Sequence, residues 1–231
     1  DEKSSGHQNR IFSVKCHPTN PNLFCSAGWD QALKIYDIKR LPIASIKGPE
    51  IAKDAIDIFD DIIVTGSNRN HDVIQLFSVS QQKLIYSFDF GSNQDVGYVL
   101  GCRFSNCGNF IFAGGAGRNE LKVFSNNSDG SANFKLLMEI KDMPGALYSI
   151  DTNPTEKFVA LGLANGATWV INTTLTKKVR NSKHTAVTSS QELSILWRLK
   201  NVRSATKRKG SKNCWIYLSQ KFEIIGVLGF W

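Results

Sequence analysis

The stretch FSVKCHPTNPNLFCSAGWDQALKIYD, from Phe12 to Asp37, decides the fold. Apolar and polar residues alternate in its short runs, as in Leu33-Lys34-Ile35-Tyr36, and a period of two is typical of β-strands. Turn-forming residues separate the runs at residues 17–22 and 28–31. The stretch therefore predicts three consecutive antiparallel strands joined by short turns.

The same order of strands and turns recurs three more times, at residues 55–78, 100–125 and 148–172. Aligning the third strands makes four residues equivalent, spaced 41, 47 and 47 positions apart: Tyr36, Phe77, Phe124 and Ile171. The runs between the repeats supply a fourth strand each, at residues 42–46, 83–88 and 134–140. A period slightly above forty with four short strands per unit is typical of propeller blades.

The first repeat carries the residues of a known family. Gly6-His7, Ser26, Asp30 and Tyr36-Asp37 resemble the Gly-His dipeptide, strand serine, turn aspartate and closing Trp-Asp of WD40 repeats, with tyrosine in place of tryptophan. The resemblance implies a buried hydrogen-bond network of His7, Ser26, Asp30 and Tyr36 that satisfies polar groups beneath a tight turn.

The other repeats lack the Gly-His dipeptide and carry Ser78, Ser125 and Asn172 at the closing aspartate. The resemblance covers residues 6–174. We therefore expect an all-β, WD40-like β-propeller, partial or irregularly ended, with blades of antiparallel four-stranded sheets.

Charge divides the chain into two parts. Residues 1–174 contain 16 Lys/Arg and 18 Asp/Glu, whereas residues 175–231 contain 12 Lys/Arg and two Glu. The sequence predicts a repeat region of about four blades at 1–174 and a basic tail at 175–231. Within the tail, residues 183–188 and 193–197 resemble the first and third strands of a fifth blade whose intervening strand is missing.

The irregular end has two interpretations. A truncated, alternatively spliced or mispredicted product of a longer propeller gene would end in this way, and so would a divergent fifth blade followed by a basic extension. The sequence opens Asp-Glu-Lys-Ser-Ser with no secretory leader, which indicates a chain cut from something longer.

The basic residues of the tail are Lys207, Arg208, Lys209 and Lys212. A solvated tail, a nuclear import signal and a weak nucleic-acid contact all fit so short a run. No DNA- or RNA-binding module accompanies them, so nucleic acid remains an alternative partner only.

The residues that could serve in catalysis or metal binding are better explained by structural roles in the repeats. His7, Ser26 and Asp30 belong to the expected network and not to a hydrolase triad, because no nucleophile elbow accompanies them. The glycine-rich residues 114–120 precede a strand, whereas a phosphate loop precedes a helix. The four histidines and five cysteines lack ligand spacing, and an odd cysteine count is typical of reduced thiols. We expect no enzymatic activity, no cofactor and no metal.

Partner recognition is the function that the resemblance implies. WD40 partners often dock on one end of the propeller, and the corresponding residues here are Arg10, Phe12, Trp29, Tyr98 and Tyr148. Aromatic residues and arginine carry much of the energy of protein interfaces.

The sequence therefore predicts a scaffold or adaptor that binds other proteins or peptides in a multi-subunit complex, in the cytoplasm or the nucleus and not in a membrane. The alternatives are a nucleic-acid-associated propeller that uses the tail and, less favoured, a propeller enzyme.

Overall fold

The computed structural model describes residues 6–40, 42–90, 98–126, 134–154 and 158–172, and the backbone of residues 223–229. These residues form sixteen β-strands and no helix. Among them, therefore, no helix is long and apolar enough to span a bilayer. The first two sheets comprise β1 (Ile11–Cys16), β2 (Leu23–Gly28), β3 (Ala32–Asp37) and β4 (Ala44–Lys47), then β5 (Ile56–Phe59), β6 (Ile62–Gly66), β7 (Ile74–Ser78) and β8 (Lys83–Phe88). The last two comprise β9 (Tyr98–Phe104), β10 (Phe110–Ala116), β11 (Leu121–Asn126) and β12 (Phe134–Ile140), then β13 (Leu147–Thr152), β14 (Phe158–Leu163), β15 (Ala167–Asn172) and β16 (Glu223–Gly229).

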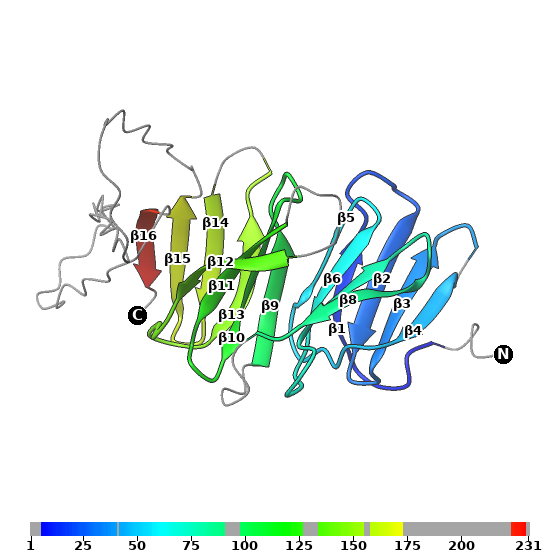
Figure 1. The fold of residues 1–231 in the computed structure, drawn as a ribbon, viewed down its shortest axis with the longest axis horizontal. Coiled ribbons are helices and arrows are strands. Elements are labelled where there is room, and N and C mark those ends of the chain that lie inside the picture. Colours follow the sequence, from blue (N-terminus) through cyan, green and yellow to red (C-terminus); the bar gives the residue numbers. More distant parts are fainter. Residues whose placement is uncertain are drawn as a thin grey trace, which may run out of the picture.

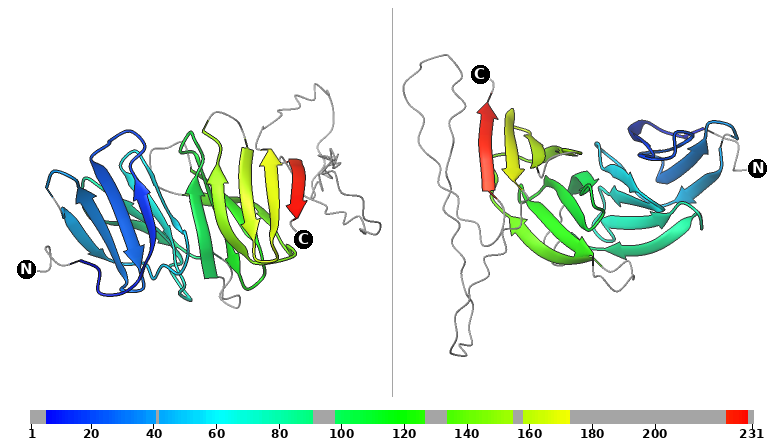
Figure 2. Two further views of the ribbon diagram at one scale, coloured as in Figure 1. Left: turned by 180° about the vertical axis from the view of Figure 1, so that it is seen from behind. Right: turned by 90° about the horizontal axis from the view of Figure 1, so that it is seen from above.

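Each sheet is an antiparallel meander of four strands in chain order, and we number the sheets blades 1 to 4. The blades follow one another around an open arc, with blade 1 and blade 4 at its two ends (Figures 1 and 2). Neighbouring blades touch mainly through their first strands: β1 with β5, β5 with β9, and β9 with β13. The predicted all-β propeller architecture is confirmed.

The repeat register is regular. Tyr36, Phe77, Phe124 and Ile171 lie in β3, β7, β11 and β15, the third strand of each blade. The residues that pair with them in the second strand are, in the same order, Phe24, Ile63, Ile111 and Val159. Blades 2 and 3 take their fourth strands at residues 83–88 and 134–140, where the alternation predicted them.

The fourth strand of blade 4 comes from the far end of the chain. Residues 223–229 form β16, which pairs with β15 from Asn172↔Glu223 to Ala167↔Gly229. The sequence analysis found no element in this stretch, because the repeat places a fourth strand soon after the third. The predicted fifth-blade strands at 183–188 and 193–197 lie outside the described residues.

The hydrophobic core is divided into three layers, each between two adjacent blades. Blade 1 packs on blade 2 around Phe77, blade 2 packs on blade 3 around Phe124, and blade 3 packs on blade 4 around Ile171. All three residues are at least 96% buried. Complete burial of such a side chain contributes roughly 1.5–3 kcal/mol, so stacking of blade upon blade is what holds the arc together.

One backbone position is left-handed in every blade. It lies in the turn between the second and third strands, and its φ angles are 55°, 50°, 50° and 82° at Gln31, Asp72, Asn119 and Gly166. L-residues other than asparagine and aspartate rarely adopt this conformation. Because the same backbone conformation recurs in all four blades, this turn is a regular part of the blade and not a variable loop.

Candidate functional site

A buried hydrogen-bond chain lies beneath the turn of blade 1. His7 Nδ1 lies 2.7 Å from Asp30 Oδ2, and His7 Nε2 lies 2.7 Å from Ser26 Oγ. The His7 and Asp30 side chains are 3% and 4% exposed. Asp30 Oδ2 also accepts from the backbone N–H of Gln8, so the carboxylate ties the segment before β1 to the turn after β2.

The resemblance implied that Tyr36 belongs to this hydrogen-bond network, but the structure places its side chain elsewhere. Its ring stacks on Phe24, with centroids 4.7 Å apart and planes 10° apart. Within the part of the chain that the structure describes, no hydrogen bond joins Tyr36 to His7, Ser26 or Asp30. A phenol on this strand stacks along its neighbour instead of reaching the serine.

The turn over this network holds Trp29 against the start of β1. The backbone N–H of Trp29 donates to Arg10 O at 3.0 Å. A side chain at Gly28 would place its Cβ 1.8 Å from the same carbonyl, so only glycine permits this approach. The backbone thus fixes where the tryptophan emerges.

Three of the predicted interface residues form one contact cluster. The Trp29 ring lies 5.0 Å from the Phe12 ring, and the Arg10 guanidinium carbon lies 5.5 Å from the Trp29 ring centroid. Trp29 remains 42% exposed. An arginine over an indole adds cation–π attraction and leaves the edges of the guanidinium free to donate.

The other two predicted residues lie at the starts of β9 and β13. Tyr98 is 37% exposed and Tyr148 is 43% exposed. Because the first strands of the repeated blades run in the same direction, these tyrosines lie on the same edge of the blades as the Trp29 cluster, the edge at which the first strands begin. The described contacts do not join them to it.

Lys53 also lies on this edge of the blades, and the sequence analysis did not predict it. Its Nζ lies 4.8 Å from the Tyr148 ring, which connects the segment before blade 2 to blade 4. No motif marks Lys53, because only the curvature of the arc brings the two residues together.

A polar network near the first strands joins three blades. The Arg103 side chain is 6% exposed, and its guanidinium donates to Ile56 O at 2.6 Å and to the Asp54 carboxylate. The same carboxylate accepts from Ser13 Oγ at 2.7 Å. Asp57, in turn, accepts from the backbone N–H of Phe104. Arg103 therefore fixes blade 3 to blade 2 through charged and backbone groups.

Asp61, in the turn between β5 and β6 of blade 2, has specific hydrogen-bond partners. Burial raises its pKa and is the largest single effect, but the hydrogen bonds from Ser78 and Ser80 together outweigh it and hold the pKa below its usual value. Ser78 Oγ donates at 2.6 Å and the backbone N–H of Ser80 at 2.7 Å. In blade 2 an aspartate from the first turn thus binds the serine that replaces the closing aspartate.

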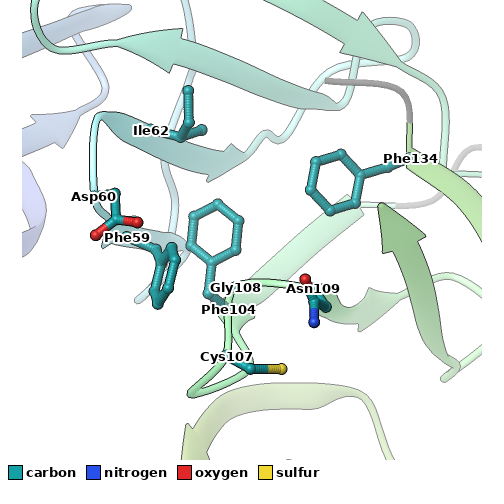
Figure 3. A pocket seen from close by; sticks show the side chains of 8 residues that line it. All are labelled: Phe59, Asp60, Ile62, Phe104, Cys107, Gly108, Asn109 and Phe134. Carbon is teal, nitrogen blue, oxygen red and sulfur yellow. The ribbon is translucent and has the colours of Figure 1, made fainter. Parts of the chain in front are cut away.

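A small pocket opens between blades 2 and 3, near the turns that follow their first strands (Figure 3). Its volume is about 230 Å³, and phenylalanine rings and the loop at Gly108 form much of its wall. The lining residues are Phe59, Asp60, Ile62, Phe104, Cys107, Gly108, Asn109 and Phe134. It lies at the opposite end of the strands from Trp29, and the polar side chains among its described lining residues are Asp60, Cys107 and Asn109.

The thiols divide into core and surface groups. Cys25 and Cys102 are buried, and burial raises the pKa of the Cys25 thiol to about 12 and that of Cys102 further. Cys16 and Cys107 are exposed. Among the described residues, no three His, Cys, Asp or Glu side chains lie together as a metal site would require. Cys214 and the basic residues Lys207, Arg208, Lys209 and Lys212 lie outside the described residues.

Comparison with protein families identifies the repeat. Residues 2–37 match the family described as WD domain, G-beta repeat. This range ends with β3 and contains the His7–Ser26–Asp30 chain, and three more blades of the same register follow it. The chain contains a WD40 repeat in a segment of four β-propeller blades. The WD40 match covers β1 to β3 of blade 1, which holds the His7–Ser26–Asp30 chain, and the later blades keep the strand geometry while lacking these residues. A comparison with curated proteins finds no match.

Proposed function

We propose that this WD40 chain is a non-enzymatic scaffold that binds other proteins or peptides. The binding surface would be the edge of the blades at which their first strands begin. We call it the Trp29 face and define it by Arg10, Phe12, Trp29, Lys53, Tyr98 and Tyr148. WD40 propellers typically serve as protein-interaction platforms, and the identity of the partner does not follow from the fold.

The observation that carries the proposal is a large aromatic side chain held rigidly and left partly exposed. Trp29 is fixed by a backbone hydrogen bond and by contacts with Phe12 and Arg10, yet 42% of it remains accessible. A preorganised aromatic residue loses little conformational entropy on binding, which is a property of interface hot spots. Ordinary core packing would bury such a ring.

The chemistry of the face favours a partner with apolar and acidic groups. Arg10 and Lys53 each lie over an aromatic ring, at Trp29 and Tyr148 respectively. Each cation can pair with a carboxylate while its ring accepts an apolar side chain. We therefore expect short peptides that combine aspartate or glutamate with a large apolar residue to bind.

A displayed random-peptide library, selected on the full chain, tests the proposal. Peptides that bind the wild-type chain should bind Trp29→Ala at least about tenfold more weakly, since truncation of a hot-spot aromatic costs 1.4 kcal/mol or more. Leu136→Ala, an exposed apolar position on the outer strand of blade 3, is the matched control and should bind normally. Peptides that bind Trp29→Ala and wild type equally would contradict the proposal, provided that the far-ultraviolet spectra agree.

Trp29→Ala and the basic tail can be tested separately. Deleting residues 198–231 would also remove β16, the outer strand of blade 4, and would confuse binding with folding. Replacing Lys207, Arg208, Lys209 and Lys212 by glutamine keeps that strand. We expect peptide binding to be unchanged by these four substitutions and by added salt. Binding that is lost on the four substitutions, or on addition of salt, would support the nucleic-acid alternative.

A further inference from the structure

At the edge of the blades opposite the Trp29 face, hydrogen bonds between turns close two of the three core layers. Between blades 1 and 2, His17 Nε2 donates to Asp60 O at 2.9 Å. Between blades 3 and 4, the side-chain amide of Asn106 donates to Asn153 O. Among the described residues, no hydrogen bond joins the turn after β5 to the turn after β9. The layer between blades 2 and 3 is therefore open at this edge, where the pocket of Figure 3 lies.

Phenylalanine rings form the apolar wall of this pocket. Phe104 lies between Phe59 and Phe134, with ring centroids 6.0 and 6.5 Å away. Gly108 has a φ of 69°, and a Cβ at this position would overlap the Phe59 ring, so only glycine lets the blade 3 turn rest on that ring. The backbone N–H of Gly108 donates to Ser105 O at 2.9 Å and holds the turn in place. The packing of the two blades thus forms the pocket in advance of any ligand.

The volume of the pocket indicates the size of its occupant. It measures about 230 Å³. Sites for drug-sized ligands and cofactors usually measure about 300–1,000 Å³, whereas an apolar cavity of about 150 Å³ can hold benzene. One aromatic or leucine-sized side chain therefore matches the space.

Asp60 makes the rim of the pocket acidic. This residue is exposed, and its left-handed backbone, with a φ of 47°, is fixed by the hydrogen bond from His17. The neighbouring Asp61 is bound by Ser78 and Ser80, but no hydrogen bond or ion pair within the described part of the chain engages the Asp60 carboxylate. Asp60 also carries the only formal charge among the described lining residues. Its carboxylate is available to pair with a cation on the occupant.

We propose that this pocket is a second docking site, for a protein segment that carries a phenylalanine or leucine beside a lysine or arginine. The apolar side chain lies on the rings, the cation pairs with Asp60 of blade 2, and the Asn109 amide of blade 3 bonds the backbone of the segment (Figure 3). The charge preference is opposite to that of the Trp29 face, where Arg10 and Lys53 favour acidic segments. Since blades 2 and 3 are neighbours within the arc, the site does not depend on what lies beyond blade 1 or blade 4.

Protection of Cys107 from alkylation tests the inference, because this exposed thiol lines the pocket. The probe is the capped pentapeptide Gly-Lys-Phe-Lys-Gly, added to the full chain over a concentration series before iodoacetamide, and mass spectrometry follows each cysteine separately. At ten times its dissociation constant the peptide should slow alkylation of Cys107 about tenfold, since roughly one site in eleven stays free. Cys16 is the internal control, because it is exposed but does not line the pocket, and its alkylation rate should not change.

Matched peptides and variants separate the apolar contact from the charge. Replacing the phenylalanine of the peptide by alanine, or both of its lysines by glutamate, should remove the protection. Asp60→Asn keeps a residue type that tolerates the left-handed backbone, and it should weaken binding of the lysine peptide about two- to fivefold, as expected for an exposed ion pair. Asp151→Asn removes the same charge from an exposed position on β13 and should bind the peptide as the wild type does.

Trp29→Ala should leave the protection of Cys107 unchanged, so this site can fail while the Trp29 face holds, and the reverse. Three results would overturn the inference. The first is Cys107 reactivity that the lysine peptide does not alter at any soluble concentration. The second is equal protection by the glutamate peptide, and the third is protection that is lost with Trp29→Ala or weakened as much by Asp151→Asn as by Asp60→Asn.

Discussion

Individual residues reveal how a repeat persists when its consensus residues do not. Only blade 1 has the His7–Ser26–Asp30 chain, yet all four blades keep a left-handed residue in the turn before the third strand. Blade 2 stabilises a turn at its other end with Asp61 and Ser78. Different polar residues therefore meet one requirement, the pairing of donors and acceptors at tight turns.

The left-handed position in blade 4 allows a clean test at this scale. Gly166 has a φ of 82°, and a Cβ added there would meet nothing within 4 Å. Gly166→Ala should therefore cost about 1 kcal/mol of folding free energy through backbone strain alone. Urea denaturation should measure the loss.

Gly6→Ala is the control for this change. Gly6 also has open space around it but no positive φ, so the alanine variant should unfold at the wild-type urea concentration. Equal effects of the two substitutions would show that the left-handed turn carries no particular cost.

At the scale of strands and blades, polar contacts complement apolar packing. The three core layers are apolar, but Arg103 of β9 reaches Ile56 O of β5 and the carboxylate of Asp54 just before it. Buried guanidinium groups are tolerated only where several acceptors surround them. This contact fixes the register of blade 3 on blade 2, which apolar packing specifies less sharply.

Replacement of this arginine should expose its contribution. Arg103→Met keeps much of the side-chain volume but leaves Ile56 O without its donor, and we expect a loss of about 2–3 kcal/mol in unfolding free energy. The Asp54 side chain is 47% exposed, so water can solvate it in the variant. Urea denaturation at neutral pH checks the value.

Lys83→Met provides the comparison. Lys83 is exposed on β8, so its replacement should change stability by less than about 0.5 kcal/mol. If Arg103→Met were equally mild, the network between the blades would be dispensable for folding.

On the scale of the whole molecule, stability depends on how many neighbours a blade has. Among the described residues, blades 2 and 3 are packed between two neighbouring blades, whereas blades 1 and 4 each pack on one neighbouring blade. In repeat architectures the stability of a unit includes the interfaces with its neighbours. The two ends of the arc should therefore open more readily than its middle.

Hydrogen exchange measures this gradient. Backbone amides of β6 and β10 in the middle blades should exchange more slowly than those of β2 and β14 in the end blades. Uniform protection across the four strands would contradict nearest-neighbour stabilisation.

The amino-acid sequence alone determined the repeat. Strand alternation and turn residues predicted four blades, the equivalence of Tyr36, Phe77, Phe124 and Ile171, and most of the fourth strands, because these depend on local periodicity. The pairing of His7 with Ser26 and Asp30 followed from the family pattern. The exposed Trp29 also followed as a candidate from its place in that pattern.

Only the tertiary structure decided what distant segments do together. It supplied β16 from residues 223–229, the contact of Lys53 with Tyr148, and the network that joins Ser13, Asp54 and Arg103. Each joins groups at least forty residues apart, and no local pattern encodes such a distance. Strand pairing within blade 4 places β16 beside β15, and the packing of each blade on the next brings the residues of the other two contacts together.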